Sequence, residues 1–295
     1  MRRRMLSVVL ALAAGYLGAG LYVVLRMTSP RPGPPEATPA FVGLAYEEVE
    51  LWSTDGIRLG AWWVPAEGSS RAAVLVPGWG GGKSDEHVLR TVPVYNRAGY
   101  GVLVFDTRAQ GESDGERRTL GYREVRDVLG ALAWLRERGY AMGDVVLHGW
   151  SMGGATALRA APGTGVAAVV EEAGYADLPL LLKGKIPEVV RFGGLFKPAI
   201  LLAGRLFPDF DAWAVRPERE AAELCKEGVP LFVVHSIGDG VVPYEHAAML
   251  AAAHPGARVW KLEGYGHVGA FEHPEYGRRL TGFLETLVID GGPEG

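Results

Sequence analysis

The chain of 295 residues is 48% hydrophobic and 22% charged, which is enough apolar material for one large α/β domain with a buried core. Its formal net charge of −4 argues against a nucleic-acid-binding surface, because such a surface needs a dense basic patch. The single cysteine, Cys225, excludes an intramolecular disulfide.

Residues 1–27 are predicted to form an uncleaved signal anchor. Arg2–Arg4 precede an uncharged apolar run from Met5 to Leu25. At about 1.5 Å per residue, these roughly 21 residues cover about 30 Å, the thickness of a hydrocarbon core. A cleaved signal peptide is the alternative, but its apolar region is shorter, and the best small-residue site, at Ala40, follows a proline. The arginine excess before the run favours a cytoplasmic N-terminus and places the rest of the chain outside the cytoplasm.

Residues 28–42 form a proline-rich segment that holds five prolines. Such a segment cannot form a helix or a central strand, and it is predicted to be an extended spacer. Packing against the domain is the alternative for its last few residues. Residues 43–290 are predicted to form one domain.

Within this domain, strand-like and helical patterns alternate. Glu47–Ser53 and Arg58–Val64 are β-rich runs joined by Thr54-Asp55-Gly56, which predicts a hairpin. A hairpin followed by βα units predicts a mostly parallel sheet with helices on both faces. The further strands expected are Ala72–Val76, Gly101–Phe105, Val145–His148, Val166–Val170, Pro230–His235 and Arg258–Leu262, with helices near Ser84–Ala98, Val125–Leu135, Ala155–Ala160, Glu218–Lys226 and Tyr244–Ala253.

The alternation stops between Val170 and Pro230. Leu178–Phe207 is rich in Leu, Ile, Val and Phe but is interrupted by Pro and Gly, so no part of it is long enough to cross a membrane. We expect residues 177–212 to form a helical lid over the carboxyl edge of the sheet. In the simpler interpretation, these residues only extend the core.

The most informative motif is Gly149-Trp150-Ser151-Met152-Gly153, which lies between a predicted strand and a predicted helix. This context is typical of a nucleophile elbow, in which a serine sits in a strained turn at the carboxyl end of a sheet. Gly149 and Gly153 remove side chains that would collide with the strand or the helix. Ser151 is therefore the candidate nucleophile.

To act as a nucleophile at neutral pH, a serine hydroxyl needs an adjacent base and a third group that orients the base. Asp239 and His267 each follow a later strand, where site residues of open α/β sheets lie, and they come in the order that this architecture uses. Asp177 and Asp211 are competing acids in or beside the insertion. The backbone amides of Met152 and Trp79 are the expected oxyanion donors.

A different interpretation rests on Gly82-Lys83-Ser84, which ends a loop one residue short of a phosphate-binding motif. Pro77 takes the place of the first glycine and removes a backbone donor that such a loop uses. A nucleotide-hydrolysing site also leaves Ser151, Asp239 and His267 unexplained.

Together these motifs resemble the serine α/β-hydrolases, in particular a membrane-anchored, lidded branch of the esterase and serine-aminopeptidase-like families. The resemblance runs from about Tyr46 to Val288. Two positions depart from the usual pattern, Pro77 in place of a histidine and Ala109 in place of a glycine. The matching stretches are Ser53–Leu59, Pro77–Gly81, Phe105–Ser113, Gly149–Gly154, Gly238–Pro243 and Gly264–His267.

The resemblance implies a Ser151-His267-Asp239 triad that cleaves a carboxylic ester through an acyl-enzyme. We expect a small-molecule ester or lipid-like substrate with an apolar acyl part, a membrane as partner through the N-terminal helix, and no nucleic-acid partner. We expect no metal and no organic cofactor. A peptidase or acyltransferase with the same triad, or a catalytically silent binding protein, are the alternatives.

Overall fold

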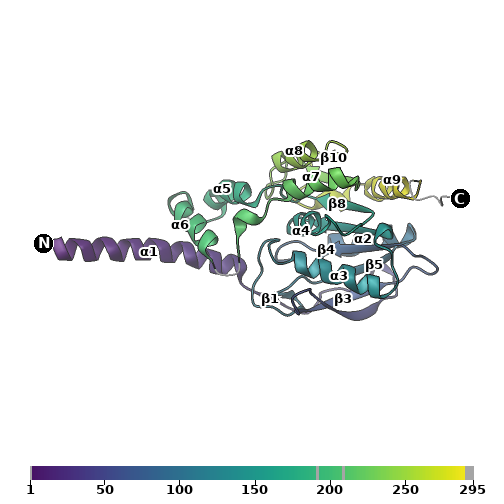
Figure 1. Ribbon diagram of the computed structural model, residues 1–295, viewed down its shortest axis with the longest axis horizontal. Helices are drawn as coiled ribbons and strands as arrows, with labels where there is room; N and C mark the ends of the chain where they lie inside the picture. Colours follow the sequence, from purple (N-terminus) through teal and green to yellow (C-terminus); the bar gives the residue numbers. More distant parts are fainter. Residues whose placement is uncertain (1, 191–192, 208–209, 290–295) are drawn as a thin grey trace.

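The computed structural model describes residues 2–190, 193–207 and 210–289, and an eight-stranded sheet lies at its centre (Figure 1). The strand order is β10-β9-β8-β7-β4-β5-β3-β2. Only the pairs β2·β3 and β3·β5 of this sheet are antiparallel, so the predicted mostly parallel sheet is confirmed. The strands are β2 (Glu47–Trp52), β3 (Arg58–Val64), β4 (Ala72–Val76), β5 (Gly101–Phe105), β7 (Val145–Trp150), β8 (Ala168–Glu172), β9 (Leu231–Ser236) and β10 (Arg258–Leu262).

Helices cover both faces of the sheet because successive residues of a buried strand point to opposite sides. On β4, Val74 belongs to one apolar cluster and Leu75 to the other. The first face is covered by α3 (Val125–Glu137), α4 (Met152–Ala160), α7 (Pro217–Glu227) and α8 (Glu245–Ala253), and the second by α2 (Glu86–Arg97) and α9 (Tyr276–Ile289).

Several strand ends differ from the prediction by one or two residues: β2 ends at Trp52, β8 begins at Ala168, and β9 is shifted by one residue to Leu231–Ser236. β7 runs on to Trp150, and β8 ends at Glu172 rather than at Val170. The ladder pairs Trp150 with Glu172, so strand pairing extends beyond the apolar run that the sequence shows. The last two residues of β8, Glu171 and Glu172, are buried although they are charged, so a pattern of apolar residues ends the strand too early.

The insertion forms two helices, α5 (Leu178–Val189) and α6 (Gly193–Leu206). They pack with the sheet's carboxyl edge in a third apolar cluster that includes Ile186, Ile200 and Met152. Residues 191–192 and 208–209 of the predicted lid, and the predicted domain end at residue 290, lie outside the described residues.

The helix α1 (Arg2–Thr28) is, among the described residues, the one helix long and apolar enough to cross a membrane. Its N-terminal half projects from the rest of the molecule (Figure 1). The proline-rich segment after it, predicted to be a spacer, packs on the domain instead. There β1 (Arg31–Pro32) pairs with β6 (Gln110–Gly111). The backbone amides of the segment need acceptors, and the Arg31 N–H donates a 2.7 Å hydrogen bond to Ala109 O.

Candidate active site

Ser151 lies at the sharp turn between β7 and α4. Its φ of 54° and ψ of −120° fall where side-chain-bearing residues are rarely found, so the surrounding packing must hold this conformation. A Cβ on Gly149 would overlap the carbonyl oxygen of Gly153, and one on Gly153 would overlap that of Val76. The turn therefore requires both glycines.

Three residues from distant loops form one hydrogen-bonded series at the carboxyl edge of the sheet. His267 Nε2 lies 2.9 Å from Ser151 Oγ, and His267 Nδ1 lies 2.7 Å from Asp239 Oδ2. Ser151 follows β7, Asp239 follows β9 and His267 follows β10, and parallel strands bring these ends to the same edge. With Nδ1–H donating to the carboxylate, Nε2 can accept the serine proton.

The carboxylate of Asp239 is buried, and hydrogen bonds stabilise its negative charge. Its Oδ1 accepts hydrogen bonds from the amides of Val241 at 2.7 Å and Val242 at 2.9 Å. Burial alone would raise the pKa of Asp239, but the hydrogen bond and charge of His267, with these two amides, hold it below the ordinary 3.8. The group is therefore ionised at neutral pH.

The two competing acids lie elsewhere in the fold. Asp177 caps α5 by accepting a 2.7 Å hydrogen bond from the Leu180 amide, and it forms an ion pair with Arg216. Asp211 accepts a 2.9 Å hydrogen bond from the Trp213 amide. The hydrogen-bond acceptor of His267 is Asp239.

The two expected oxyanion donors flank Ser151. Met152 is the first residue of α4, so its N–H has no partner within the helix and carries the positive end of the helix dipole. The loop that carries Trp79 touches the elbow, since a Cβ on Gly78 would lie 3.4 Å from that of Ser151. Neither amide donates to another described residue, so both remain available to a ligand oxygen.

A largely apolar cavity of about 210 Å³ opens beside Ser151. Residues of the expected lid supply part of its wall, and so does Met27 of α1, which the sequence analysis did not connect to the site. No local signal in the sequence connects Met27 to Ser151, because only the docking of α1 brings them together. The lining residues are Met27, Trp79, Leu120, Ser151, Met152, Tyr175, Leu178, Leu181, Leu182, Lys185, Ile186, Val190, Gly240, Val241 and Val242.

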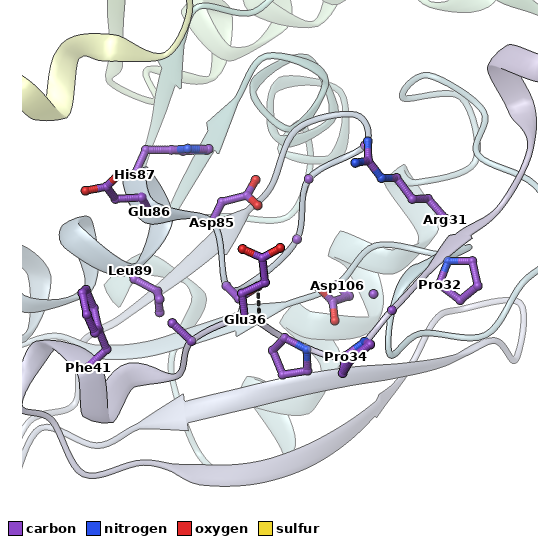
Figure 2. Close-up of a pocket in the computed structure, with 18 residues that line it drawn as sticks. Arg31, Pro32, Pro34, Glu36, Phe41, Asp85, Glu86, His87, Leu89 and Asp106 are labelled. Atoms are coloured by element: carbon purple, nitrogen blue, oxygen red, sulfur yellow. Dashed lines mark hydrogen bonds between the residues drawn. The ribbon is translucent and has the colours of Figure 1, made fainter.

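A larger cavity of about 760 Å³ lies between the proline-rich segment and the glycine-rich loop, and Ser151 is not in its wall (Figure 2). Its wall carries the carboxyl groups of Glu36, Asp85, Glu86 and Asp106. Burial raises the pKa of Asp85, and the carboxylates of Asp106 and Glu36 raise it further. Arg31 also lines the cavity and lowers the pKa of Asp85, but one guanidinium among four carboxyl groups does not make a phosphate site.

Lys83, the lysine of the near phosphate-binding motif, is also occupied. Its Nζ lies 2.9 Å from Asp106 Oδ2, and a second ion pair joins it to Glu112. The side chain is 1% exposed, so no face of the ammonium is open to a nucleotide. The nucleotide-hydrolysing interpretation therefore finds no support in this loop.

The matches to known proteins show the family and the fold. The profile of the Alpha/beta hydrolase family covers residues 73–276. The chain belongs to the alpha/beta hydrolase family. Over 246 residues it is 26% identical to lysophosphatidylserine lipase ABHD12 of Macaca fascicularis, covering 76% of this chain and 58% of that protein. Over 120 residues it is 33% identical to thiohydrolase aneE of Aspergillus aculeatus, covering 39% and 37%. The chain thus spans less than two thirds of the length of these curated relatives.

Solved structures of low sequence identity share the fold. The esterase Pf2001 of Pyrococcus furiosus superimposes with a TM-score of 0.71 at 20% identity, over 88% of this chain and 98% of that one. A puromycin-hydrolyzing peptidase of Mycobacterium tuberculosis superimposes with a TM-score of 0.64 at 21% identity, over 85% of this chain and 40% of that one. The predicted fold class is therefore confirmed.

Proposed function

We propose that the protein is a serine hydrolase that cleaves carboxylic esters with an apolar acyl part. The observation that carries the proposal is the series Asp239–His267–Ser151, with its serine at the mouth of an apolar cavity. A hydroxyl activated by an oriented imidazole is the arrangement that acyl transfer needs.

In the proposed reaction, His267 Nε2 takes the proton of Ser151 Oγ as that oxygen attacks the acyl carbon. The amides of Met152 and Trp79 hold the negative charge that develops on the carbonyl oxygen. His267 then protonates the leaving alcohol, and the acyl group stays on Ser151. A water then gives a proton to His267 and attacks the acyl carbon. The bond to Ser151 Oγ breaks, the acid leaves, and His267 returns the proton to the serine oxygen.

The apolar cavity and the names of the relatives favour an ester of a fatty or otherwise apolar acid. The lid helix α5 and Met27 supply carbon surface to the wall of the cavity. We further propose that α1 is an uncleaved signal anchor that holds the domain at the outer side of a membrane. The arginines at its N-terminus support this orientation.

Labelling by a fluorophosphonate probe tests the proposal. The wild-type protein is expected to be labelled, Ser151→Ala is expected to lose the label, and Ser84→Ala, a serine of the glycine-rich loop, is expected to keep it. Well-folded wild-type protein that takes up no label would favour a binding protein without activity.

A substrate panel then separates the reaction classes. Esters of p-nitrophenol with short and medium acyl chains are compared with aminoacyl amides, with Ser151→Ala as the background. Faster turnover of the amides would make the protein a peptidase rather than an esterase.

A further inference from the structure

The second lid helix, α6, packs along the membrane-anchor candidate α1. Tyr16 Oη donates a 2.9 Å hydrogen bond to Leu195 O, and the Tyr16 and Phe196 rings stack with centroids 5.5 Å apart. Further along, a Cβ on Gly20 would lie 2.5 Å from the carbonyl carbon of Ala199. Small residues at a helix crossing allow backbones to approach closely, as they do between helices inside membranes.

The contacts also fix the direction of α6. Tyr16 lies beside Phe196, Gly20 beside Ala199, and Val24 near Gly204. Both helices therefore run toward the domain together, with Leu195 at the far end of α6. Figure 1 shows α6 beside the part of α1 that adjoins the domain.

The length of α1 decides where α6 must lie. The part before these contacts, Arg2–Gly15, is about 14 residues long and covers about 21 Å, which is less than the roughly 30 Å of a hydrocarbon core. If α1 crosses the membrane, part of the segment from Tyr16 to Leu25 must also lie in hydrocarbon. The first half of α6 lies beside that segment.

The outer face of α6 suits this position. Leu195, Leu202 and Leu206 are 68%, 45% and 71% exposed, and they recur along one side of the helix. On α1, Leu17, Leu21 and Leu25 are also exposed and share a hollow with Leu202 and Leu206, which Glu116 and Arg117 of the domain also line.

The charges of the lid fit a membrane surface. Residues 178–207 carry five Lys or Arg and one Glu in a chain whose net charge is −4. Arg205 is exposed next to Leu206 at the domain-side end of α6, where headgroups are expected. Basic residues around an apolar helix face are typical of segments that lie in a membrane interface.

We propose that the exposed leucine face of α6 is a membrane-binding surface that enters the leaflet on the domain side, packed against α1. The bilayer is the partner, and the lid takes its position from it. This inference rests on the proposed membrane anchor, and it places the apolar cavity at Ser151 where a lipid-borne ester can reach it.

The single cysteine makes a direct depth measurement practical. In a Cys225→Ser background, a fluorophore is attached at Leu195→Cys and at Leu206→Cys, and the full chain is placed in nanodiscs that contain spin-labelled lipids. Leu12→Cys on α1 is the control inside the membrane. Helix α9 lies at the opposite end of the molecule from α1 (Figure 1), so Glu285→Cys, at an exposed position of α9, is the control in water.

Both α6 probes are expected to be quenched more than twofold. Leu195→Cys should respond more to a quencher near the acyl-chain ends, and Leu206→Cys more to one near the headgroups, because α6 runs toward the domain. Glu285→Cys should not be quenched. Fluorophosphonate labelling of Ser151 in the same samples shows that each variant is folded.

Two results would overturn the proposal in different ways. Quenching at Leu12→Cys but at neither α6 probe would place the lid in water beside a true anchor. No quenching at Leu12→Cys either would show that α1 does not enter the bilayer, and it would contradict the proposed anchor. Labelling at Ser151 is independent of both results, so the hydrolase proposal stands or falls separately.

Discussion

The indole nitrogen of Trp79 donates a 3.1 Å hydrogen bond to the carbonyl oxygen of Met27, so the loop that carries a proposed oxyanion donor is tied to the end of α1. Arg118 reinforces this junction. Its guanidinium lies over the Trp79 ring at 4.6 Å, and its backbone amide donates to Thr28 O at 2.9 Å. The end of the anchor candidate is therefore part of the site's support.

Trp79→Phe is expected to lower kcat/KM by less than tenfold. The substitution removes the bond to Met27, worth about 0.5–1.5 kcal/mol, but keeps the backbone N–H that we assign to the oxyanion hole. Esterase kinetics on a short p-nitrophenyl ester measure the effect. Trp52→Phe, on the exposed face of the edge strand β2, is the matched control and should leave the rate unchanged. A loss of a hundredfold or more would show that the indole itself takes part in the reaction.

Asp239→Asn is expected to lower kcat by about 10⁴-fold, because an amide at this position no longer holds Nδ1–H of His267 and favours the wrong tautomer. The protein should still fold, which circular dichroism and a thermal melt can show. Asp211→Asn supplies the comparison for the competing acid, since asparagine also caps a helix. Equal losses in the two variants would contradict the assignment of Asp239.

Much of this architecture could be predicted from the sequence because each strand is a short apolar run and each site candidate follows such a run. Ser151, Asp239 and His267 lie together because the carboxyl ends of parallel strands share one edge. The residues that line the apolar cavity beside Ser151 were harder to predict from the sequence. Met27 lies more than a hundred residues before Ser151 in the chain and lines the cavity only because α1 packs against the domain. A hydrophobic periodicity within one segment cannot predict such a contact.

The proline-rich segment shows the same limit. Its composition disfavours a central strand, and it forms none, but the expectation of no helix was wrong at its two ends: Thr28 belongs to α1, and Pro39–Val42 form a short 3-10 helix, in which a proline at the first position is tolerated. Composition also does not show that β6 offers carbonyl partners for the amides of this segment. The end of β8 was misplaced because Glu171 and Glu172 look like surface residues until the neighbouring strands bury them.

Gly153→Ala is expected to destabilise the fold by about 1–3 kcal/mol and to reduce activity, because its new methyl group overlaps the carbonyl oxygen of Val76. Thermal melts compare it with Gly282→Ala in α9. No atom lies within 4 Å of a Cβ at Gly282, so that change should stabilise the helix by up to about 1 kcal/mol. A Gly153→Ala variant as stable as the wild type would mean that the elbow adapts more freely than its packing indicates.

Glu172→Gln is expected to be more stable than the wild type at alkaline pH. Burial is the main cause that raises the pKa of Glu172 from 4.5 to about 8, and Tyr276 Oη donates to its Oε2 at 3.3 Å. Below pH 4.5 both the folded and the unfolded chain hold the proton. Between pH 4.5 and about 8 the unfolded chain releases it while the folded chain keeps it, so the free energy of unfolding falls as pH rises.

The glutamine has no proton to lose, so the stability difference between Glu172→Gln and the wild type should grow with pH and level off above pH 8. Between pH 5 and pH 8 the growth is on the order of 3 kcal/mol, from the size of the pKa shift. Melts of both proteins across this range measure it. Glu285→Gln, on the exposed side of α9, should show no such trend. A difference that stays constant with pH would mean that Glu172 is already ionised in the folded protein.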